Sequence, residues 1–218
     1  MPGVYDHVIF DLDGTLVDTR IDLSLAVNHV RRGLGLPDLP LDVVCRMVGE
    51  GARILVQRAL GPEPGCSIDD ALARFLAYYG AHLLDHTQAY PGVRELLAAL
   101  TARGVLLSVL TNKPAAMSQA IVDGLGLSGY ITHLIGGDSL PVRKPDPAGI
   151  ERLCQLAGVG PARTLVVGDS AIDARTARAA GVTFCGVAWG FAPDTLRALG
   201  ADPIIEQPAE LLRVVGRV

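Results

Sequence analysis

Short apolar runs that end in polar turns recur along this chain, and they predict buried strands. The first run covers residues 7–10 and stops at the turn formed by residues 11–15. Five later runs of the same kind lie at residues 105–110, 133–135, 164–167, 183–187 and 203–205. Stretches of helical character lie between or after them, at residues 93–103, 115–125, 147–157, 171–180 and 209–215. Strands that alternate with helices in this way predict right-handed βαβ units and a parallel sheet.

The segment from residue 18 to about residue 86 interrupts this alternation, because it holds helical patterns and no convincing strand. Its apolar positions keep helical spacing, and glycine and proline residues divide it into several helices. We therefore expect an α/β fold with two parts. Residues 1–17 and 88–218 would form a Rossmann-like core around a parallel sheet, and residues 18–87 would form an inserted α-helical cap domain.

Composition and charge narrow the class of protein further. The 218 residues carry 19 basic and 23 acidic side chains, and the net charge of −4 argues against a broad surface for nucleic acid or an anionic membrane. No apolar run approaches the roughly 18 residues that a membrane span needs, and residues 1–6 lack the basic and apolar regions of a signal peptide. We expect a cytoplasmic protein, a monomer or a homodimer, whose partner is a small molecule.

Two groups of residues are expected to have structural roles only. The paired Arg31 and Arg32 are interpreted as a solvated helix face. The cysteines form no CxxC pair, so we expect reduced and mostly buried thiols instead of a zinc site or a disulfide framework; they are Cys45, Cys66, Cys154 and Cys185.

Acidic side chains gather where predicted strands end. Asp11 and Asp13 follow the first strand, Asp169 follows another, and Asp173 lies one helical turn after Asp169. Ligands of open parallel sheets bind at the carboxyl ends of the strands. Carboxylates crowded at that edge would repel each other, and a divalent cation such as Mg²⁺, which prefers oxygen ligands, would relieve the repulsion. A single turn with two aspartates is more typical of a helix cap or a local turn, but several acidic turns at strand ends favour a ligand-binding site.

A candidate anion site accompanies the acidic residues. Thr111 and Asn112 follow a strand and precede a helix, whose first N–H groups can bind an anion. Only Lys113 and Lys144 are lysines among the 19 basic residues, and Lys144 could place a compact positive charge on the same anion. Taken alone, a solvated surface lysine would be the simpler interpretation of Lys144.

Four motifs, in order, resemble the haloacid dehalogenase superfamily of phosphatases. They are FDLDGTLVDT at residues 10–19, LTNKP at residues 110–114, GGDSLPVRKPDP at residues 136–147 and VVGDSAIDARTARAAG at residues 166–181. Within this superfamily, residues 47–60, 89–93 and 136–141 are similar to the phosphoglycolate phosphatase family. Relatives that are dehalogenases lack an aspartate at the position of Asp13, so its presence favours phosphate chemistry.

The resemblance implies a reaction and the residues that carry it. The reaction would be Mg²⁺-dependent hydrolysis of a small organic phosphate, 2-phosphoglycolate above all, to an alcohol and phosphate. Asp11 would be the nucleophile and form an aspartyl-phosphate, and Asp13 would act as general acid and then general base. Phosphate would be bound by Asp11, Gly14, Thr15, Thr111, Asn112 and Lys144. The metal would be held by Asp11, Asp13 through its carbonyl and Asp169, with Asp173 behind them.

Residues of the cap would determine which substrate is bound. The turn at residues 49–51 with Arg53 after it is a candidate for binding the second anionic group of a substrate, although a surface arginine on a flexible turn is the simpler interpretation. Ile172 stands where many relatives carry asparagine, and Trp189 and Phe191 are expected to pack over the sheet edge. Pyrophosphate, sugar phosphate or nucleotide substrates, a phosphomutase, and a non-catalytic phosphate-binding protein remain as alternatives.

Overall fold

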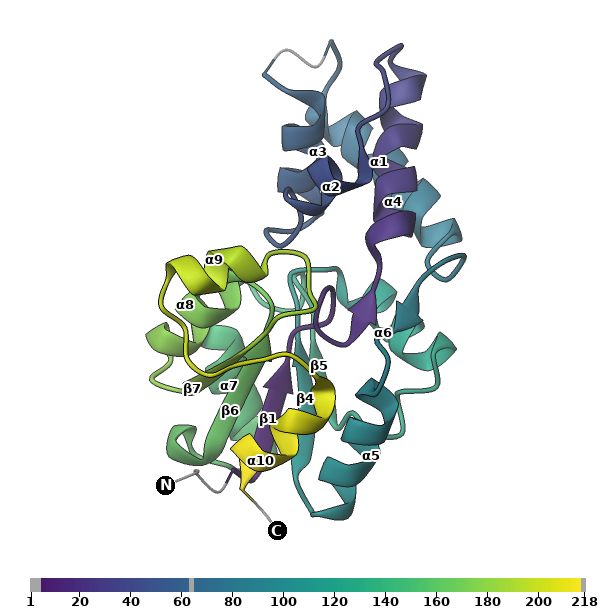
Figure 1. The fold of residues 1–218 in the computed structure, drawn as a ribbon. Helices are drawn as coiled ribbons and strands as arrows, with labels where there is room; N and C mark the ends of the chain where they lie inside the picture. The colour runs from purple at the N-terminus through teal and green to yellow at the C-terminus, as the bar shows by residue number, and fades with distance from the viewer. Residues whose placement is uncertain (1–4, 63–64, 217–218) are drawn as a thin grey trace.

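A six-stranded parallel sheet forms the centre of the structure, a computed structural model that describes residues 5–62 and 65–216 (Figure 1). Residues 1–4 and 217–218 of the expected core, and residues 63–64 of the expected cap, therefore lie outside the described residues. The strand order is β5-β4-β1-β6-β7-β8. The strands are β1 His7–Phe10, β4 Leu106–Leu110, β5 His133–Ile135, β6 Thr164–Gly168, β7 Thr183–Val187 and β8 Ile204–Ile205. The six predicted strands and their parallel arrangement are confirmed, with bounds shifted by one residue at most.

Alternation along β1 explains why helices cover both faces of this sheet. Val8 and Phe10 point to one apolar cluster and Ile9 points to another. The first cluster includes residues of α5 Val93–Ala102, α6 Ala115–Gly124 and α10 Leu211–Val215, and the second includes residues of α7 Ala148–Ala157 and α8 Ala171–Ala179. The same part of the chain also contains α9 Pro193–Ala198 and two short 3₁₀ helices, Pro161–Arg163 and Pro208–Glu210. This is the α/β Rossmann-like architecture expected from the sequence.

A second group of helices stands beyond the carboxyl ends of the strands (Figure 1). It consists of α1 Arg20–Gly33, α2 Leu41–Cys45, α3 Ala52–Leu60 and α4 Ile68–Ala81. These helices bury an apolar cluster of their own, which includes Val27, Leu55 and Phe75. Because the core and the four helices have separate apolar clusters, we propose to divide the chain as the sequence suggests, into a core of residues 1–17 and 88–218 and a cap of residues 18–87.

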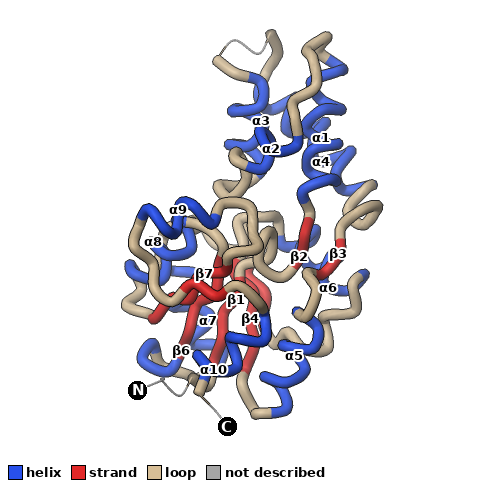
Figure 2. The backbone as a smooth tube through the Cα atoms, viewed as in Figure 1, coloured by secondary structure: helices blue, strands red, loops and turns tan. Residues whose placement is uncertain are grey.

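Two chain segments join the cap to the core, and they lie side by side (Figure 2). Val17–Asp18 (β2) and Gln88–Ala89 (β3) pair as a two-stranded antiparallel sheet at this crossing. Just beyond it, the buried Asp22 carboxylate accepts hydrogen bonds from the backbone N–H groups of His86 and Thr87. The crossing therefore fixes where the cap leaves the core. Strands of two residues are too short to show an alternation of apolar and polar positions, so they could not be predicted.

The described structure corrects one expectation about arginine and bears out another about cysteine. Arg31 is buried, because its guanidinium donates to the carbonyls of Pro37 and Ala59 instead of facing solvent. The helical pattern could not show that the chain after α1 folds back over this side chain. The cysteines are free, and Cys66 is half-buried while the other three are buried.

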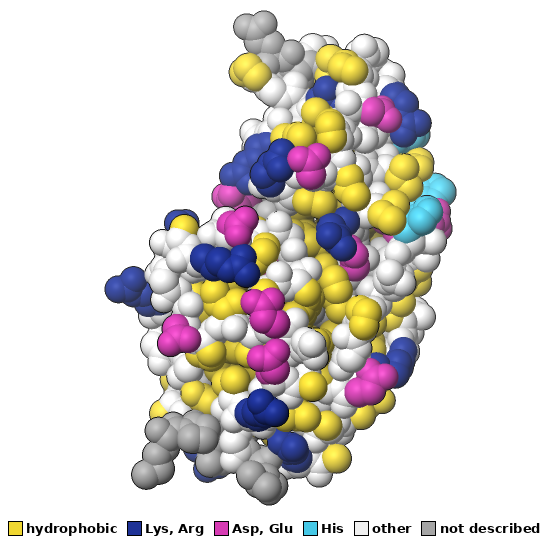
Figure 3. All heavy atoms as spheres, in the orientation of Figure 1, with side chains coloured by type: hydrophobic (Ala, Val, Ile, Leu, Met, Phe, Trp, Pro, Cys, Tyr) yellow, Lys and Arg dark blue, Asp and Glu magenta, His cyan; other side chains and the backbone are white. Residues whose placement is uncertain are grey.

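Surface charge is mixed on the face drawn in Figure 3. Basic and acidic side chains of the described residues are interspersed there, with no single-sign patch among them. In the part of the chain that the structure describes, none of the helices has both the length and the apolar character that crossing a lipid bilayer requires.

Candidate active site

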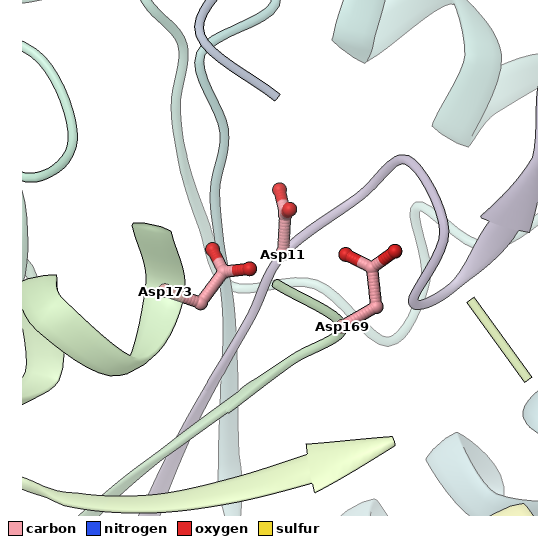
Figure 4. A group of neighbouring side chains, drawn as sticks. All are labelled: Asp11, Asp169 and Asp173. Carbon is pink, nitrogen blue, oxygen red and sulfur yellow. The ribbon is translucent and has the colours of Figure 1, made fainter. Parts of the chain in front are cut away.

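Three carboxylates converge at the carboxyl edge of the sheet (Figure 4). Asp11 directly follows β1, and Asp169 directly follows β6, which is the hydrogen-bonded neighbour of β1. Asp173 lies in the first turn of α8, where it accepts hydrogen bonds from the Ser170 N–H and hydroxyl groups. One oxygen from each carboxylate lies within 4.8 Å of the other two. The sheet register and a helix cap thus bring together residues that are far apart in the sequence.

Burial and mutual repulsion disfavour the charged forms of this cluster. Burial, and next the charge of Asp173, raise the pKa of Asp11 from its ordinary value of 3.8 to about 7. Burial and the charges of Asp173 and Asp11 likewise raise the pKa of Asp169 well above its usual range. Three crowded oxygen donors with raised pKa values are a donor set that suits a hard divalent cation, which would relieve the repulsion. The residues present therefore fit a metal ion.

Lys144 lies directly beside this cluster. Its Nζ is 2.9 Å from Asp11 Oδ1 and 2.7 Å from Asp173 Oδ1, and its side chain is almost fully enclosed. Burial alone would lower the pKa of Lys144, but the charges of Asp11 and Asp173 outweigh it and hold that pKa above the usual range. Lys144 is therefore an ammonium that orients the Asp11 carboxylate.

Asp13 does not belong to this group of three carboxylates, and its side chain contacts a second lysine. Its Oδ1 accepts hydrogen bonds from Thr19 Oγ1 at 2.6 Å and from Lys113 Nζ at 2.5 Å. Lys113 Nζ also donates to the hydroxyl of Tyr79, on cap helix α4, at 2.7 Å. The sequence assigned no role to Lys113 or Tyr79. The rarity of lysine in the chain was the available signal for Lys113, and Tyr79 had none.

Thr111 and Asn112 extend from the end of β4, the other neighbour of β1. Both line the cavity in front of Asp11. The Thr111 hydroxyl accepts a hydrogen bond from the Lys113 N–H, while Asn112 Nδ2 donates to the carbonyl of Lys144 at 3.0 Å and to that of Gly49, in the cap, at 2.9 Å. Asn112 therefore connects the turn after β4, the lysine loop and the cap.

The cavity between cap and core measures about 50 Å³. One water molecule needs roughly 10–15 Å³ of such space, so the cavity suits a small ligand. Its core side carries polar groups, which include Asp11, Asp13, Thr111, Lys113 and Asp169, and also apolar residues such as Met117. Its cap side is largely apolar and includes Leu23, Val48, Leu55, Phe75 and Leu76.

Phe191 also belongs to this cavity, and it packs against the apolar cluster of the cap helices. Its backbone N–H donates to Asp169 Oδ2 at 2.6 Å, and it lines the cavity. Trp189, by contrast, packs against the core cluster and donates through Nε1 to the carbonyl of Thr15. The hydrogen bond from the Phe191 backbone could not be predicted, because a pattern of side chains does not show where a backbone N–H points.

Four of the candidate phosphate-binding residues do not line this cavity: Gly14, Thr15, Arg53 and Lys144, of which Lys144 contacts Asp11. Arg53 is exposed and forms an ion pair with Asp69, although Gly49 and Gly51 of the same turn do line the cavity. Gly14 lies against Asp169: its φ is +82°, and a Cβ there would come within 2.2 Å of Asp169 Oδ2. Thr15 is buried, and its hydroxyl has no hydrogen-bond partner among the described residues. The structure thus gives Gly14 a steric role beside Asp169.

Comparisons with known proteins agree with this geometry. A model of the family described as haloacid dehalogenase-like hydrolase matches residues 8–187. The chain is 43% identical over 212 residues to a phosphoglycolate phosphatase of Rhodospirillum rubrum, covering 94% of this chain and 88% of that one. It is 40% identical to a phosphoglycolate phosphatase of Chromobacterium violaceum, covering 94% and 93%. A crystal structure of a predicted phosphoglycolate phosphatase from Haemophilus somnus 129pt superposes with a TM-score of 0.89 at 33% identity, covering 96% and 97%.

The chain therefore belongs to the haloacid dehalogenase-like hydrolase family. The resemblance read from its four motifs is confirmed, as is the fold class that it implied.

Proposed function

We propose that this chain is a Mg²⁺-dependent phosphomonoesterase that hydrolyses 2-phosphoglycolate to glycolate and phosphate in the cytoplasm. One observation carries the proposal: Asp11, held at 2.9 Å by Lys144, faces a small cavity with two further carboxylates beside it. The substrate is suggested by the names of the relatives, which are 40–43% identical over most of their length. The roles of the side chains are those that the family resemblance implies, and their positions support these roles.

Asp11 performs the first step. Its free carboxylate oxygen attacks phosphorus, an aspartyl O–P bond forms, and the bond from phosphorus to the ester oxygen breaks. Asp13 gives its proton to that oxygen, so that glycolate leaves as an alcohol. Lys144 holds Asp11 in place, and Thr111 with the N–H of Asn112 binds phosphoryl oxygens.

Asp13 also begins the second step. Now unprotonated, it takes a proton from water, whose oxygen attacks phosphorus as the aspartyl O–P bond breaks. Phosphate is released, and Asp11 is again a free carboxylate. Asp13 can serve both steps because Lys113 and Thr19 fix its carboxylate from one side while its place in the cavity wall leaves it open to substrate.

Mg²⁺ would be held by Asp11, Asp169 and the Asp13 carbonyl, with Asp173 behind them. When bound, the ion neutralises negative charge on the transferring phosphoryl group. Asp173 is placed behind the others because its two oxygens already accept hydrogen bonds from Lys144 and Ser170. Phe191 fixes Asp169 through its backbone N–H.

A substrate panel tests this function. We expect phosphate release with the highest kcat/KM for 2-phosphoglycolate, compared with pyrophosphate, a sugar phosphate and a nucleoside monophosphate. EDTA should lower the rate at least about 100-fold, because a catalytic metal supplies several kcal/mol of stabilisation to the transition state. Equal rates with and without EDTA would contradict the metal requirement. A nucleotide as the best substrate would contradict the substrate assignment.

Thermal unfolding should depend on pH and Mg²⁺ together. Because the pKa of Asp11 is raised from 3.8 to about 7, its contribution to the stability of the metal-free protein is full below pH 4 and falls as the pH rises toward 7. Mg²⁺ needs the ionised carboxylates, so it should raise Tm more at pH 8 than at pH 5. At a concentration of 100 Kd the gain is about 2.7 kcal/mol, or roughly 5–11 °C for a chain of this size.

Differential scanning fluorimetry with and without Mg²⁺ at both pH values measures this difference. A larger Mg²⁺ effect at pH 5 than at pH 8 would show that the carboxylate cluster does not bind the ion.

A further inference from the structure

Lys113 is the one cationic side chain that lines the cavity among the described residues. Its side chain is only 5% exposed. Its ammonium group donates hydrogen bonds to two acceptors, Asp13 Oδ1 at 2.5 Å and the Tyr79 hydroxyl at 2.7 Å. An ammonium has three N–H donors. In the described part of the chain no third acceptor contacts Lys113 Nζ, so its third N–H is available to bind a ligand in the cavity.

Tyr79 offers a second donor at the same point. Its hydroxyl oxygen accepts the hydrogen bond from Lys113, so its own O–H remains to be donated. Tyr79 is fully buried on α4, and its ring also lies 4.9 Å from Lys113 Nζ. The cap side chains around it are apolar, among them Phe75 and Leu76. Lys113 and Tyr79 thus form a polar pair against an otherwise apolar wall.

The place of this pair relative to the reaction indicates what it binds. In the proposed function Asp13 contacts the ester oxygen of the substrate, and Lys113 Nζ lies 2.5 Å from an Asp13 oxygen. The part of the leaving group next to that ester oxygen therefore lies close to Lys113. In 2-phosphoglycolate this part is one methylene, bonded to the ester oxygen, and the carboxylate that the methylene carries.

We infer that Lys113, with Tyr79, binds the carboxylate of the leaving group and so selects phosphate esters that carry an anionic group one carbon from the ester oxygen. This inference rests on the proposed function and names the residues that would set its substrate class. When Asp13 acts as the acid its carboxyl is neutral, and the Lys113 ammonium is then the counter-charge for the substrate carboxylate. The residue assigned here lies in the core, whereas the sequence suggested Arg53 of the cap.

Lysine suits this position better than arginine. The three donors of an ammonium diverge, so they can reach Asp13, Tyr79 and a substrate carboxylate at once, whereas a guanidinium presents its donors in one plane. We therefore expect Lys113→Arg to restore little of the selectivity that Lys113→Met loses.

The test compares two substrates of the same shape, 2-phosphoglycolate and its neutral amide, 2-phosphoglycolamide. The measured quantity is the ratio of their kcat/KM values, so effects on Asp13 and on folding cancel. Lys113→Met should lower this ratio about 100-fold, which is the usual effect of removing one buried charged partner. Tyr79→Phe, which deletes one neutral hydroxyl, should lower it about 10-fold. Arg53→Gln should leave the ratio unchanged.

Each other result has a definite meaning. An unchanged ratio in Lys113→Met, with both substrates slowed equally, would show that Lys113 only positions Asp13 and would overturn the inference. A changed ratio in Arg53→Gln would place the carboxylate at the cap turn instead. If Lys113→Met is inactive on both substrates, the Tyr79→Phe ratio decides. A wild-type protein that does not prefer the carboxylate over the amide contradicts the proposed substrate before any variant is compared.

Discussion

Replacing the nucleophile should nearly abolish activity: we expect Asp11→Asn to lower kcat/KM for 2-phosphoglycolate at least about 10⁴-fold, the scale of effect seen when a covalent nucleophile is removed. An amide oxygen carries no charge with which to attack phosphorus. A continuous assay of phosphate release measures the loss. Asp69→Asn is a matched control, because Asp69 is exposed and pairs with Arg53 away from the cavity. Asp69→Asn should keep its activity within about two-fold.

The same Asp11→Asn variant should fold at least as stably as the wild type when no metal is present. Asp11 is a buried carboxylate whose pKa is raised to about 7 by burial and by Asp173, so its charge at pH 8 opposes folding. Asparagine removes that charge with little change in shape. Activity within about ten-fold of wild type, together with an unchanged Tm, would show that Asp11 is not the nucleophile.

Removing Lys144 should have the largest effect on stability. Lys144→Met leaves the carboxylates of Asp11 and Asp173 without the ammonium that lies 2.9 and 2.7 Å from them. Breaking a buried ion pair by deleting one partner costs about 3–5 kcal/mol of unfolding free energy. Lowering the pH should reduce this loss, because protonation removes the unpaired charges. Activity should fall as well, since Asp11 loses the group that orients it.

Urea denaturation of the metal-free protein at pH 8 and pH 5 measures the effect of Lys144→Met. Arg197→Met is the comparison, because Arg197 forms an exposed pair with Asp194 and such pairs contribute only about 0–1 kcal/mol. A loss of less than about 1 kcal/mol for Lys144→Met at pH 8 would contradict the buried charge network described here.

The meeting of Asp11, Thr111 and Asp169 could be predicted from the sequence, because the sheet itself brings these residues together. Asp11, Thr111 and Asp169 each follow a strand, and those three strands are neighbours in the order β4-β1-β6. Buried parallel strands are recognisable from local apolar runs, so the meeting of their carboxyl ends could be anticipated. Lys144 was anticipated from the rarity of lysine in the chain together with the family motif, since its loop carries no periodic signal.

The parts that escaped prediction depend on contacts between elements that are far apart in the sequence. Arg53 has a favourable position in the sequence, but its side chain pairs with Asp69 on the outside of the cap. Lys113 and Tyr79 are 34 residues apart and meet only because α4 is placed over the turn after β4. Phe191 contributes a backbone N–H. Local spacing describes one helix or strand at a time and cannot place two domains against each other.

The most direct test of the central claim is to trap the phosphoryl group on the protein. Asp13→Asn should be allowed to react with acetyl phosphate and Mg²⁺, then quenched in acid, digested and analysed by mass spectrometry. Acetate leaves without needing a proton, so the first step proceeds, whereas the second step lacks its base and the phosphoenzyme accumulates. We predict one added phosphoryl group, on the peptide that contains Asp11. A phosphoryl group on any other residue, or steady phosphate release with no phosphorylated peptide, would contradict the account.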